Sequence, residues 1–227
     1  MTVVIDPAHG GADSGARGPS GVNEKDLVLT LGRALRAQLA QQGHRVVMTR
    51  DGDSDPTYDE RASIANAIRD AIFITLHVSS TGPPGTARTY YYQFFSPFVF
   101  PTAVSESTPS VTSVSAPPQA LSPAPNSLVE WREAQRPIVD VSHRLADALQ
   151  MQLAQQFSGS QGMADAAAVR ELRSVTVPAV AVEVSSVAVP NPASIAAMAA
   201  PLSAAIAKGI SDFRMAQPAT PGMGEWR

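Results

Sequence analysis

The chain has 227 residues, with 17 Lys and Arg, 20 Asp and Glu, four histidines and no cysteine. This length suits one domain, or one domain with an appendage, and a hydrophobic fraction of 44% indicates a globular protein. The net charge of −3 gives no reason to expect a nucleic-acid partner. No apolar run approaches the roughly 20 residues that span a bilayer, which argues against an integral membrane protein. Without cysteine, disulfides, thiol catalysis and thiolate metal sites are excluded.

Hydrophobic periodicity divides most of the chain into alternating strands and helices. A glycine-rich loop follows the first strand and extends to Gly21, and Gly43 ends the first helix. The expected elements are, in chain order, a strand over 3–6, a helix carrying Leu27, Leu31, Leu35 and Leu39, a strand over 45–49, a helix over 58–69, strands over 71–78 and 89–95, a helix from about 128 to 153, a strand over 177–183 and a helix over 192–213.

Residues 96–127 interrupt this alternation. They hold seven prolines, eight serines, no glycine and one charged residue, Glu106, which is typical of an extended or flexible insertion. We therefore expect one domain over 1–215 that contains this insertion, and an unpacked tail over 216–227.

Strands that are apolar throughout and alternate with helices indicate a parallel sheet covered on both faces. The expected fold class is α/β, with a mainly parallel, twisted sheet of about six strands and helices on both faces. In such sheets functional groups gather beyond the carboxyl ends of the strands.

Four candidate functional groups fall on that edge. His9 follows the first strand, Glu24 begins the next helix, His77 lies at the end of the strand over 71–78, and Glu183 closes the strand over 177–183. Taken alone, each has a structural interpretation. A histidine at a strand end is commonly a hydrogen-bonded structural residue, and an acidic residue such as Glu24 in a first helical turn interacts with the helix dipole. Together they predict a His/Glu/His zinc site with one position open to water. Glu24 is the better ligand because it is tied to the His9 loop, and Glu183 is the better general base.

Other polar and aromatic residues have structural interpretations. We expect His44 at the surface and a solvated or interhelical position for His143. For Arg61 and Asn66 we expect structural hydrogen bonds, with substrate contact as the alternative. The alternating tyrosines over 90–92 are expected to pack in or against the sheet, with sugar stacking as the alternative.

Several segments together resemble the zinc-dependent N-acetylmuramoyl-L-alanine amidases of bacterial cell walls, the amidase-3 family. The resemblance runs from residue 3 to about 213 and is interrupted by the insertion. It rests on Ile5-Asp6-Pro7-Ala8-His9-Gly10-Gly11-Ala12-Asp13-Ser14-Gly15-Ala16, Gly21-Val22-Asn23-Glu24-Lys25-Asp26, Thr49-Arg50, Arg61 with Ala65-Asn66, the strand ending at His77, and Pro178-Ala179-Val180 leading to Glu183.

The resemblance implies one Zn²⁺ held by His9, Glu24 and His77, with Glu183 as the catalytic carboxylate. It also implies hydrolysis of the amide between the lactyl group of N-acetylmuramic acid and L-alanine, for cell-wall remodelling or daughter-cell separation. The sequence differs from the family pattern in Ala8, in Ser79 and in Val184-Ser185-Ser186 after Glu183. Two alternatives therefore stay open: a catalytically impaired peptidoglycan-binding or regulatory homologue, and a zinc peptidase that cuts within the stem peptide.

The implied substrate, peptidoglycan, places the protein in the periplasm or the cell envelope, although no signal peptide is visible in this chain. We expect a monomer. The insertion also suggests regulation, in which Glu106, Glu130 or Glu133 occupies the open metal position until an activator protein acts on the 96–137 region.

Overall fold

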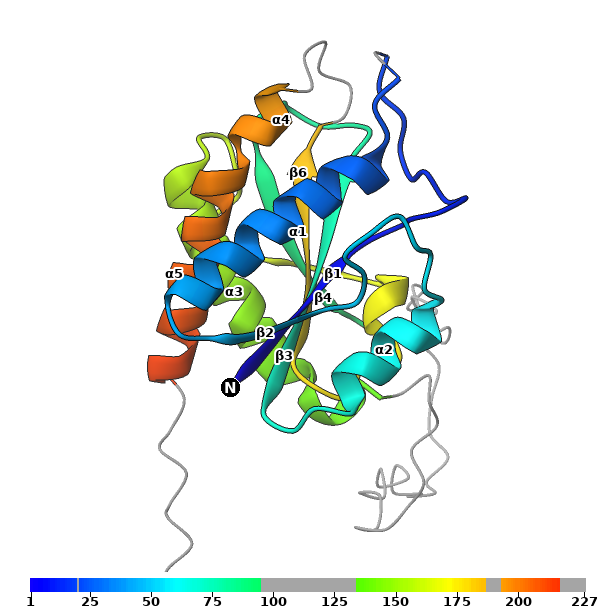
Figure 1. Ribbon diagram of the computed structural model, residues 1–227. Coiled ribbons are helices and arrows are strands. Elements are labelled where there is room, and N and C mark those ends of the chain that lie inside the picture. Colours follow the sequence, from blue (N-terminus) through cyan, green and yellow to red (C-terminus); the bar gives the residue numbers. More distant parts are fainter. Residues whose placement is uncertain (20, 95–133, 187–192, 217–227) are drawn as a thin grey trace, which may run out of the picture.

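The computed structural model describes residues 1–19, 21–94, 134–186 and 193–216 (Figure 1). The insertion over 96–127, the three glutamates assigned to regulation and the tail after Ala216 lie outside these ranges. The described elements are β1 (Thr2–Pro7), α1 (Glu24–Gln41), β2 (Arg45–Met48), α2 (Tyr58–Asn66), β3 (Ala71–Ser79), β4 (Ala87–Tyr92), the 3-10 helix η2 (Arg136–Ile138), α3 (Val139–Gln156), β5 (Asp165–Ala167), the 3-10 helix η3 (Arg170–Leu172), β6 (Ala179–Ser185), α4 (Ala193–Ala197) and α5 (Ala199–Ala216).

The six described strands form one sheet in the order β2-β1-β3-β6-β4-β5. Strands β2, β1, β3 and β6 are parallel neighbours, and β4 pairs antiparallel with β6. The mainly parallel sheet predicted from the sequence is confirmed. Because β1, β3 and β6 run the same way and lie side by side, their carboxyl ends meet at one edge.

Helices cover both faces of the sheet, as expected. Helices α1, α3 and α5 lie together on one face, and α2 lies on the other (Figure 1). The first face buries a large apolar core, in which Leu31 and Leu35 of α1 and Leu149 of α3 are at most 1% exposed. The second face has a smaller core that includes Phe73, Leu172 and the α2 residues Ala62 and Ala65.

Helix α2 begins with a complete capping box, in which the Thr57 hydroxyl accepts from the Glu60 N–H and the Glu60 carboxylate accepts from the Thr57 N–H. It ends at Asn66, three residues before the predicted end. Strands β3 and β6 both continue to serines, Ser79 and Ser185, so His77 and Glu183 lie two residues inside their strands rather than at the ends.

Prolines account for two further differences. The helix expected from about 128 begins as α3 at Val139, directly after a 3-10 turn that contains Pro137; residues 128–133 lie outside the described ranges. The last helix is divided at Met198, because Pro201 has no N–H to donate to the Ala197 carbonyl. The short strand β5 was missed by the sequence analysis, since three residues give no periodic signal.

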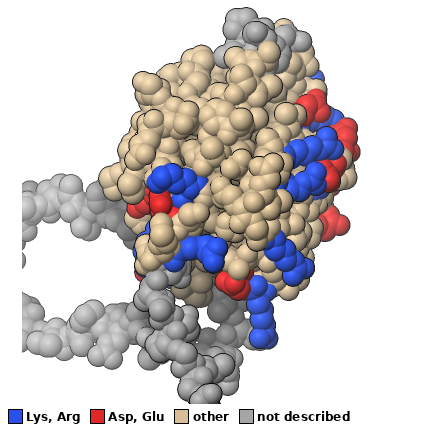
Figure 2. All heavy atoms as spheres, turned by 60° about the vertical axis from the view of Figure 1, so that its left-hand side comes forward, with Lys and Arg blue, Asp and Glu red and all other residues tan. Residues whose placement is uncertain are grey.

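Charged side chains of both signs lie mainly along the right edge and the lower part of the view in Figure 2, and the middle of this side is largely uncharged. Ion pairs made by helices α1 and α5 include Arg36 with Asp51 at 2.6 Å and Lys208 with Asp212 at 3.0 Å. Among the described residues, no helix combines the length and the apolar character needed to cross a membrane.

Candidate metal centre

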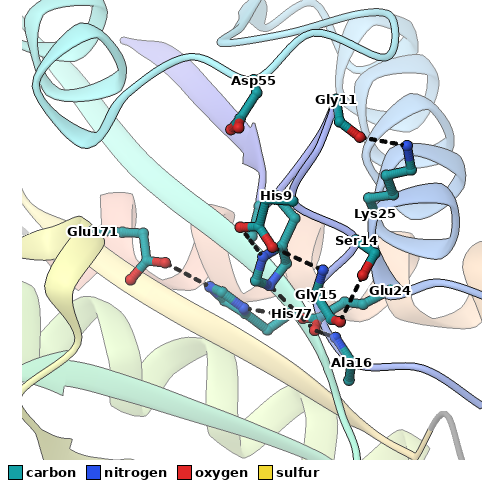
Figure 3. A network of polar contacts seen from close by, with 12 residues as sticks. His9, Gly11, Ser14, Gly15, Ala16, Glu24, Lys25, Asp55, His77 and Glu171 are labelled. Carbon is teal, nitrogen blue, oxygen red and sulfur yellow. Dashed lines mark hydrogen bonds and ion pairs between the residues drawn. The ribbon is translucent and has the colours of Figure 1, made fainter.

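Three of the four predicted site residues come together at the carboxyl edge of the sheet. The ligand atoms of His9, Glu24 and His77 all lie within 4.8 Å of one another, and they form the one group able to hold a metal ion within the described ranges. His9 comes from the loop after β1, Glu24 from the first turn of α1 and His77 from β3 (Figure 3). The sequence-based grouping of these residues agrees with the geometry.

Glu24 lies at the centre of the group. Its side chain is 7% exposed; Oε2 lies 3.2 Å from His9 Nε2, and Oε1 lies 3.1 Å from His77 Nδ1. Each oxygen also accepts a backbone hydrogen bond, Oε2 from the Ala16 N–H and Oε1 from the Val78 N–H, both at 2.9 Å. The carboxylate is thereby fixed between the first loop and β3 before any metal binds.

The loop that carries His9 is shaped by backbone conformation. His9 has a φ of 62°, and Gly15 has a φ of 61°. A Cβ at Gly15 would lie 2.6 Å from His9 Cδ2 and 2.7 Å from Glu24 Oε2. Only glycine therefore fits at this position without displacing two of the candidate ligands.

Buried charges beneath the site hold the loop on the sheet. The fully buried Asp6 accepts from Arg61 at 2.7 Å, from Thr75 at 2.9 Å and from Thr49. Arg61 also donates to the His9 carbonyl at 2.8 Å. Arg61 thus makes structural hydrogen bonds, as predicted. Asn66 does so too, because its side-chain amide donates to the Ser174 carbonyl and accepts from the Thr176 N–H, in the segment before β6.

The three side chains alter one another's proton equilibria. The hydrogen bond with Glu24 is the largest influence on His9; with Asp13 adding to it and burial opposing it, the pKa of His9 rises to about 9. Burial alone would lower the pKa of His77, but Glu24 and Glu171 raise it. Burial would likewise raise the pKa of Glu24, yet the two histidines and the Ala16 N–H hold that pKa far below its usual range. Without metal, the site is an ionised carboxylate between two imidazoles that attract protons.

Glu183, the fourth predicted residue, lies beside this group. It pairs in register with His77 across β3 and β6, so the two residues share one face of the sheet. The Tyr90 hydroxyl donates to Glu183 Oε1 at 3.1 Å. Burial, with Glu183 adding to it, raises the pKa of Tyr90 above its ordinary value, which keeps this hydroxyl a donor.

The other two histidines belong to different surroundings. His143 stacks on Tyr91 of β4 with ring centroids 4.1 Å apart and pairs with Asp147 at 3.2 Å, so it is partly solvated and packs on the sheet rather than between helices. His44 follows the turn after α1 and is partly exposed.

Glu171 was missed by the sequence analysis. Its Oε1 lies 3.6 Å from His77 Nε2, and its side chain is 12% exposed. It comes from η3, a single 3-10 turn within Arg170-Glu171-Leu172-Arg173, and a short charged stretch of this kind gives no periodic signal.

The fold and the site define an α/β protein with a His/Glu/His group that could hold a metal ion at the carboxyl edge of a mainly parallel sheet. The chain belongs to the amidase-3 family, described as N-acetylmuramoyl-L-alanine amidase, whose model matches residues 3–212.

Individual relatives match over part of their length. The chain is 34% identical over 90 residues to the N-acetylmuramoyl-L-alanine amidase AmiC of Neisseria meningitidis, which is 40% of this chain and 22% of that protein. It is 38% identical over 86 residues to AmiA of Escherichia coli K12, which is 37% of this chain and 29% of the relative. The matches thus span less than a third of these two relatives.

Solved structures support the fold over nearly the whole chain. AmiC2 of Nostoc punctiforme superposes with a TM-score of 0.65 at 24% identity, covering 95% of this chain and 97% of that one. The CwlD amidase of Clostridioides difficile, solved in complex with the GerS lipoprotein, has a TM-score of 0.66 at 17% identity, with coverage of 95% and 99%.

Proposed function

We propose that this protein is a zinc-dependent N-acetylmuramoyl-L-alanine amidase that cleaves peptidoglycan between the lactyl group of N-acetylmuramic acid and L-alanine. The observation that carries the proposal is the group of His9, Glu24 and His77 on one edge of an amidase fold. In this proposal these three residues hold one Zn²⁺, and Glu183 is the catalytic carboxylate.

The chemistry and spacing of the donor atoms suit zinc. Zinc binds imidazole nitrogen and carboxylate oxygen at about 2.0–2.2 Å in a tetrahedron, which places two ligand atoms about 3.3–3.6 Å apart. The observed separations from Glu24 are 3.2 Å to His9 Nε2 and 3.1 Å to His77 Nδ1, slightly shorter than that range. Three protein ligands leave a fourth position, as in catalytic zinc sites.

When bound, zinc would polarise the scissile carbonyl and lower the pKa of water at the open position. Glu183 then takes a proton from the attacking water and returns it to the leaving amine of L-alanine. Its register beside His77 supports this role, and the hydrogen bond from Tyr90 to Oε1 holds the carboxylate in place. Glu24 is held by two histidines and two N–H groups, which suits a ligand rather than a base.

The test is product analysis on purified peptidoglycan. Wild-type protein loaded with zinc is expected to release free stem peptides that begin with L-alanine, identified by mass, and a chelator is expected to abolish their release. Glu183→Gln should retain zinc but release products at least about 100-fold more slowly, as expected for loss of a general base. Glu60→Gln is the matched control, since Glu60 is exposed and glutamine also completes a capping box.

The other outcomes identify the alternatives. Cleavage between amino acids of the stem peptide would indicate a zinc peptidase. Binding to peptidoglycan without products would indicate the impaired homologue, which the unusual Val184-Ser185-Ser186 segment after Glu183 favours. Either result would contradict the proposed amidase.

The proposed substrate places the protein in the periplasm or cell envelope. We also propose that the protein is a monomer and that an activator protein acts on its 96–137 region; the complex of CwlD with GerS supports partner binding in this family. Deleting 96–127 is expected to raise the rate on peptidoglycan, and an unchanged rate would contradict autoinhibition by this segment.

A further inference from the structure

Each candidate histidine ligand has one nitrogen that faces Glu24 and another that faces away. The second nitrogen of His9, Nδ1, lies 2.7 Å from Asp13 Oδ2. The second nitrogen of His77, Nε2, lies 3.6 Å from Glu171 Oε1 (Figure 3). The two rings therefore share an arrangement, with Glu24 on one side and a further carboxylate on the other.

Glu171 is held in this place by the packing of η3. Its neighbour Leu172 is fully buried in the core of the second face. Its other neighbour, Arg170, places its guanidinium 4.5 Å from the centroid of the Tyr58 ring on α2. These two contacts anchor the turn on either side of Glu171, so its carboxylate is presented to His77 by a fixed backbone.

Thr75 offers a second acceptor to His77 Nε2. Its Oγ1 lies 3.5 Å from this nitrogen and donates its own hydrogen to Asp6. A hydroxyl is a neutral acceptor, whereas Glu171 is a carboxylate, and interactions with a charged acceptor are about twice as strong. Of the two groups, Glu171 is thus the one that can orient the ring most strongly.

We propose that Glu171 is a positioning residue for His77, with the role that Asp13 has for His9. Its carboxylate attracts the Nε2 hydrogen, which selects the tautomer whose Nδ1 lone pair points toward Glu24 and the metal position. Carboxylates behind histidine ligands fix ring orientation and raise ligand basicity in this way. The inference rests on the zinc site of the proposed function, but it concerns metal affinity rather than the reaction.

Zinc affinity, measured by competition with a chromophoric chelator, tests this proposal without an activity assay. Glu171→Gln, which keeps the shape and removes the charge, is expected to weaken zinc binding about 10- to 100-fold. Glu171→Asp keeps the charge one methylene farther back and should give a smaller loss. The visible spectrum of the Co²⁺-substituted protein should change in Glu171→Gln, because the His77 ring is reoriented, and Glu60→Gln should match wild type in both measurements.

Unchanged affinity and an unchanged Co²⁺ spectrum in Glu171→Gln would overturn the proposal. It would equally be overturned if Thr75→Val weakened binding and Glu171→Gln did not, since Thr75 would then orient the ring. Circular dichroism of the metal-free variants checks that each is folded. A wild-type protein that binds zinc tightly but releases no stem peptides would contradict the proposed function alone.

Discussion

The two faces of the sheet are built from alternate residues of the same strands, yet they differ in character. In β3, Ile72, Ile74 and Leu76 point to the face covered by α1, α3 and α5, where they join a continuous apolar core. Phe73 and His77 point to the opposite face. That second face is apolar near the amino ends of the strands and becomes polar toward the carboxyl ends, where Asp6, Thr75 and His77 lie. Glu24 comes from α1 on the first face and contacts His77 at this edge.

Within one strand, the residues that point to the first face therefore contribute mainly to stability, and those at the carboxyl end of the second face contribute to the candidate site. The first face buries most of the apolar surface, which supplies the main driving force for folding. Near the carboxyl ends of the strands, the second face buries charged groups, which are tolerated only because they have hydrogen-bond partners. The partners of Asp6 are Arg61, Thr49 and Thr75. Substitutions on the two faces should therefore have separable effects on folding and on metal binding.

Replacing the central ligand should have the largest effect on metal binding. Glu24→Gln keeps the volume of the side chain but removes the charge between the two histidines. We expect zinc affinity to fall by more than about 100-fold, beyond the loss typical of residues behind a ligand, and amidase activity to disappear. Zinc content after dialysis measures the first effect. Asp26→Asn, in the same helical turn but exposed, is the control; comparable zinc loss there would indicate a helix-charge effect instead.

A substitution in the apolar core of the first face should lower stability without changing zinc binding. Ile74→Ala removes a fully buried side chain from the first core, so the free energy of unfolding should fall by about 2–5 kcal/mol. Denaturant titration measures this loss. Zinc bound per folded molecule should stay at the wild-type value. If folded Ile74→Ala protein had lost its zinc, packing in the first core would be needed for metal binding, and the effects on the two faces would not be separable.

A matched pair of glycines sharpens the comparison within the loop that carries His9. Gly15 and Gly21 both have positive φ, so alanine is strained at either position by about 1–2 kcal/mol. A Cβ at Gly15 would also collide with His9 and Glu24, whereas a Cβ at Gly21 meets nothing within 4 Å. Gly15→Ala should therefore weaken zinc binding about tenfold or more, by displacing ligands as mutations around a ligand do, and Gly21→Ala should not. Equal zinc affinities in the two variants would contradict the prediction that a Cβ at residue 15 displaces His9 and Glu24.

The contrast between the faces also explains what the sequence could predict. Apolar strands alternating with helices were sufficient for the fold, and the shared carboxyl edge of parallel strands was sufficient to group His9, Glu24 and His77. The direction of β4 depends on its pairing with β6, which no local pattern encodes. Glu171 reaches His77 through a three-residue turn, and its position is set by the packing of Leu172 and Arg170. The catalytic role of Glu183 stays a prediction until products are measured.

Proton release on metal binding should make zinc affinity depend on pH, by about tenfold per pH unit for one proton. In the absence of metal the pKa of His9 is raised to about 9, chiefly by the hydrogen bond with Glu24, so His9 carries a proton at pH 7 that zinc must displace. Apparent zinc affinity should therefore rise with pH until about 9. Calorimetry in buffers with different ionisation enthalpies counts the protons released.

The stability of the metal-free protein should change with pH in the other direction. The pKa of His9 is raised on folding, so the contribution of its charged form to stability is complete below about 6.5, the ordinary histidine value, and is lost as pH rises through about 9. Metal-free protein should thus unfold at lower denaturant concentration at pH 9 than at pH 6.5, whereas the zinc-bound protein should not lose this contribution, because the metal replaces the proton on His9. Zinc affinity that stays flat between these pH values, with no proton released, would show that His9 is already neutral beside Glu24 and that the charge on this face is balanced in another way.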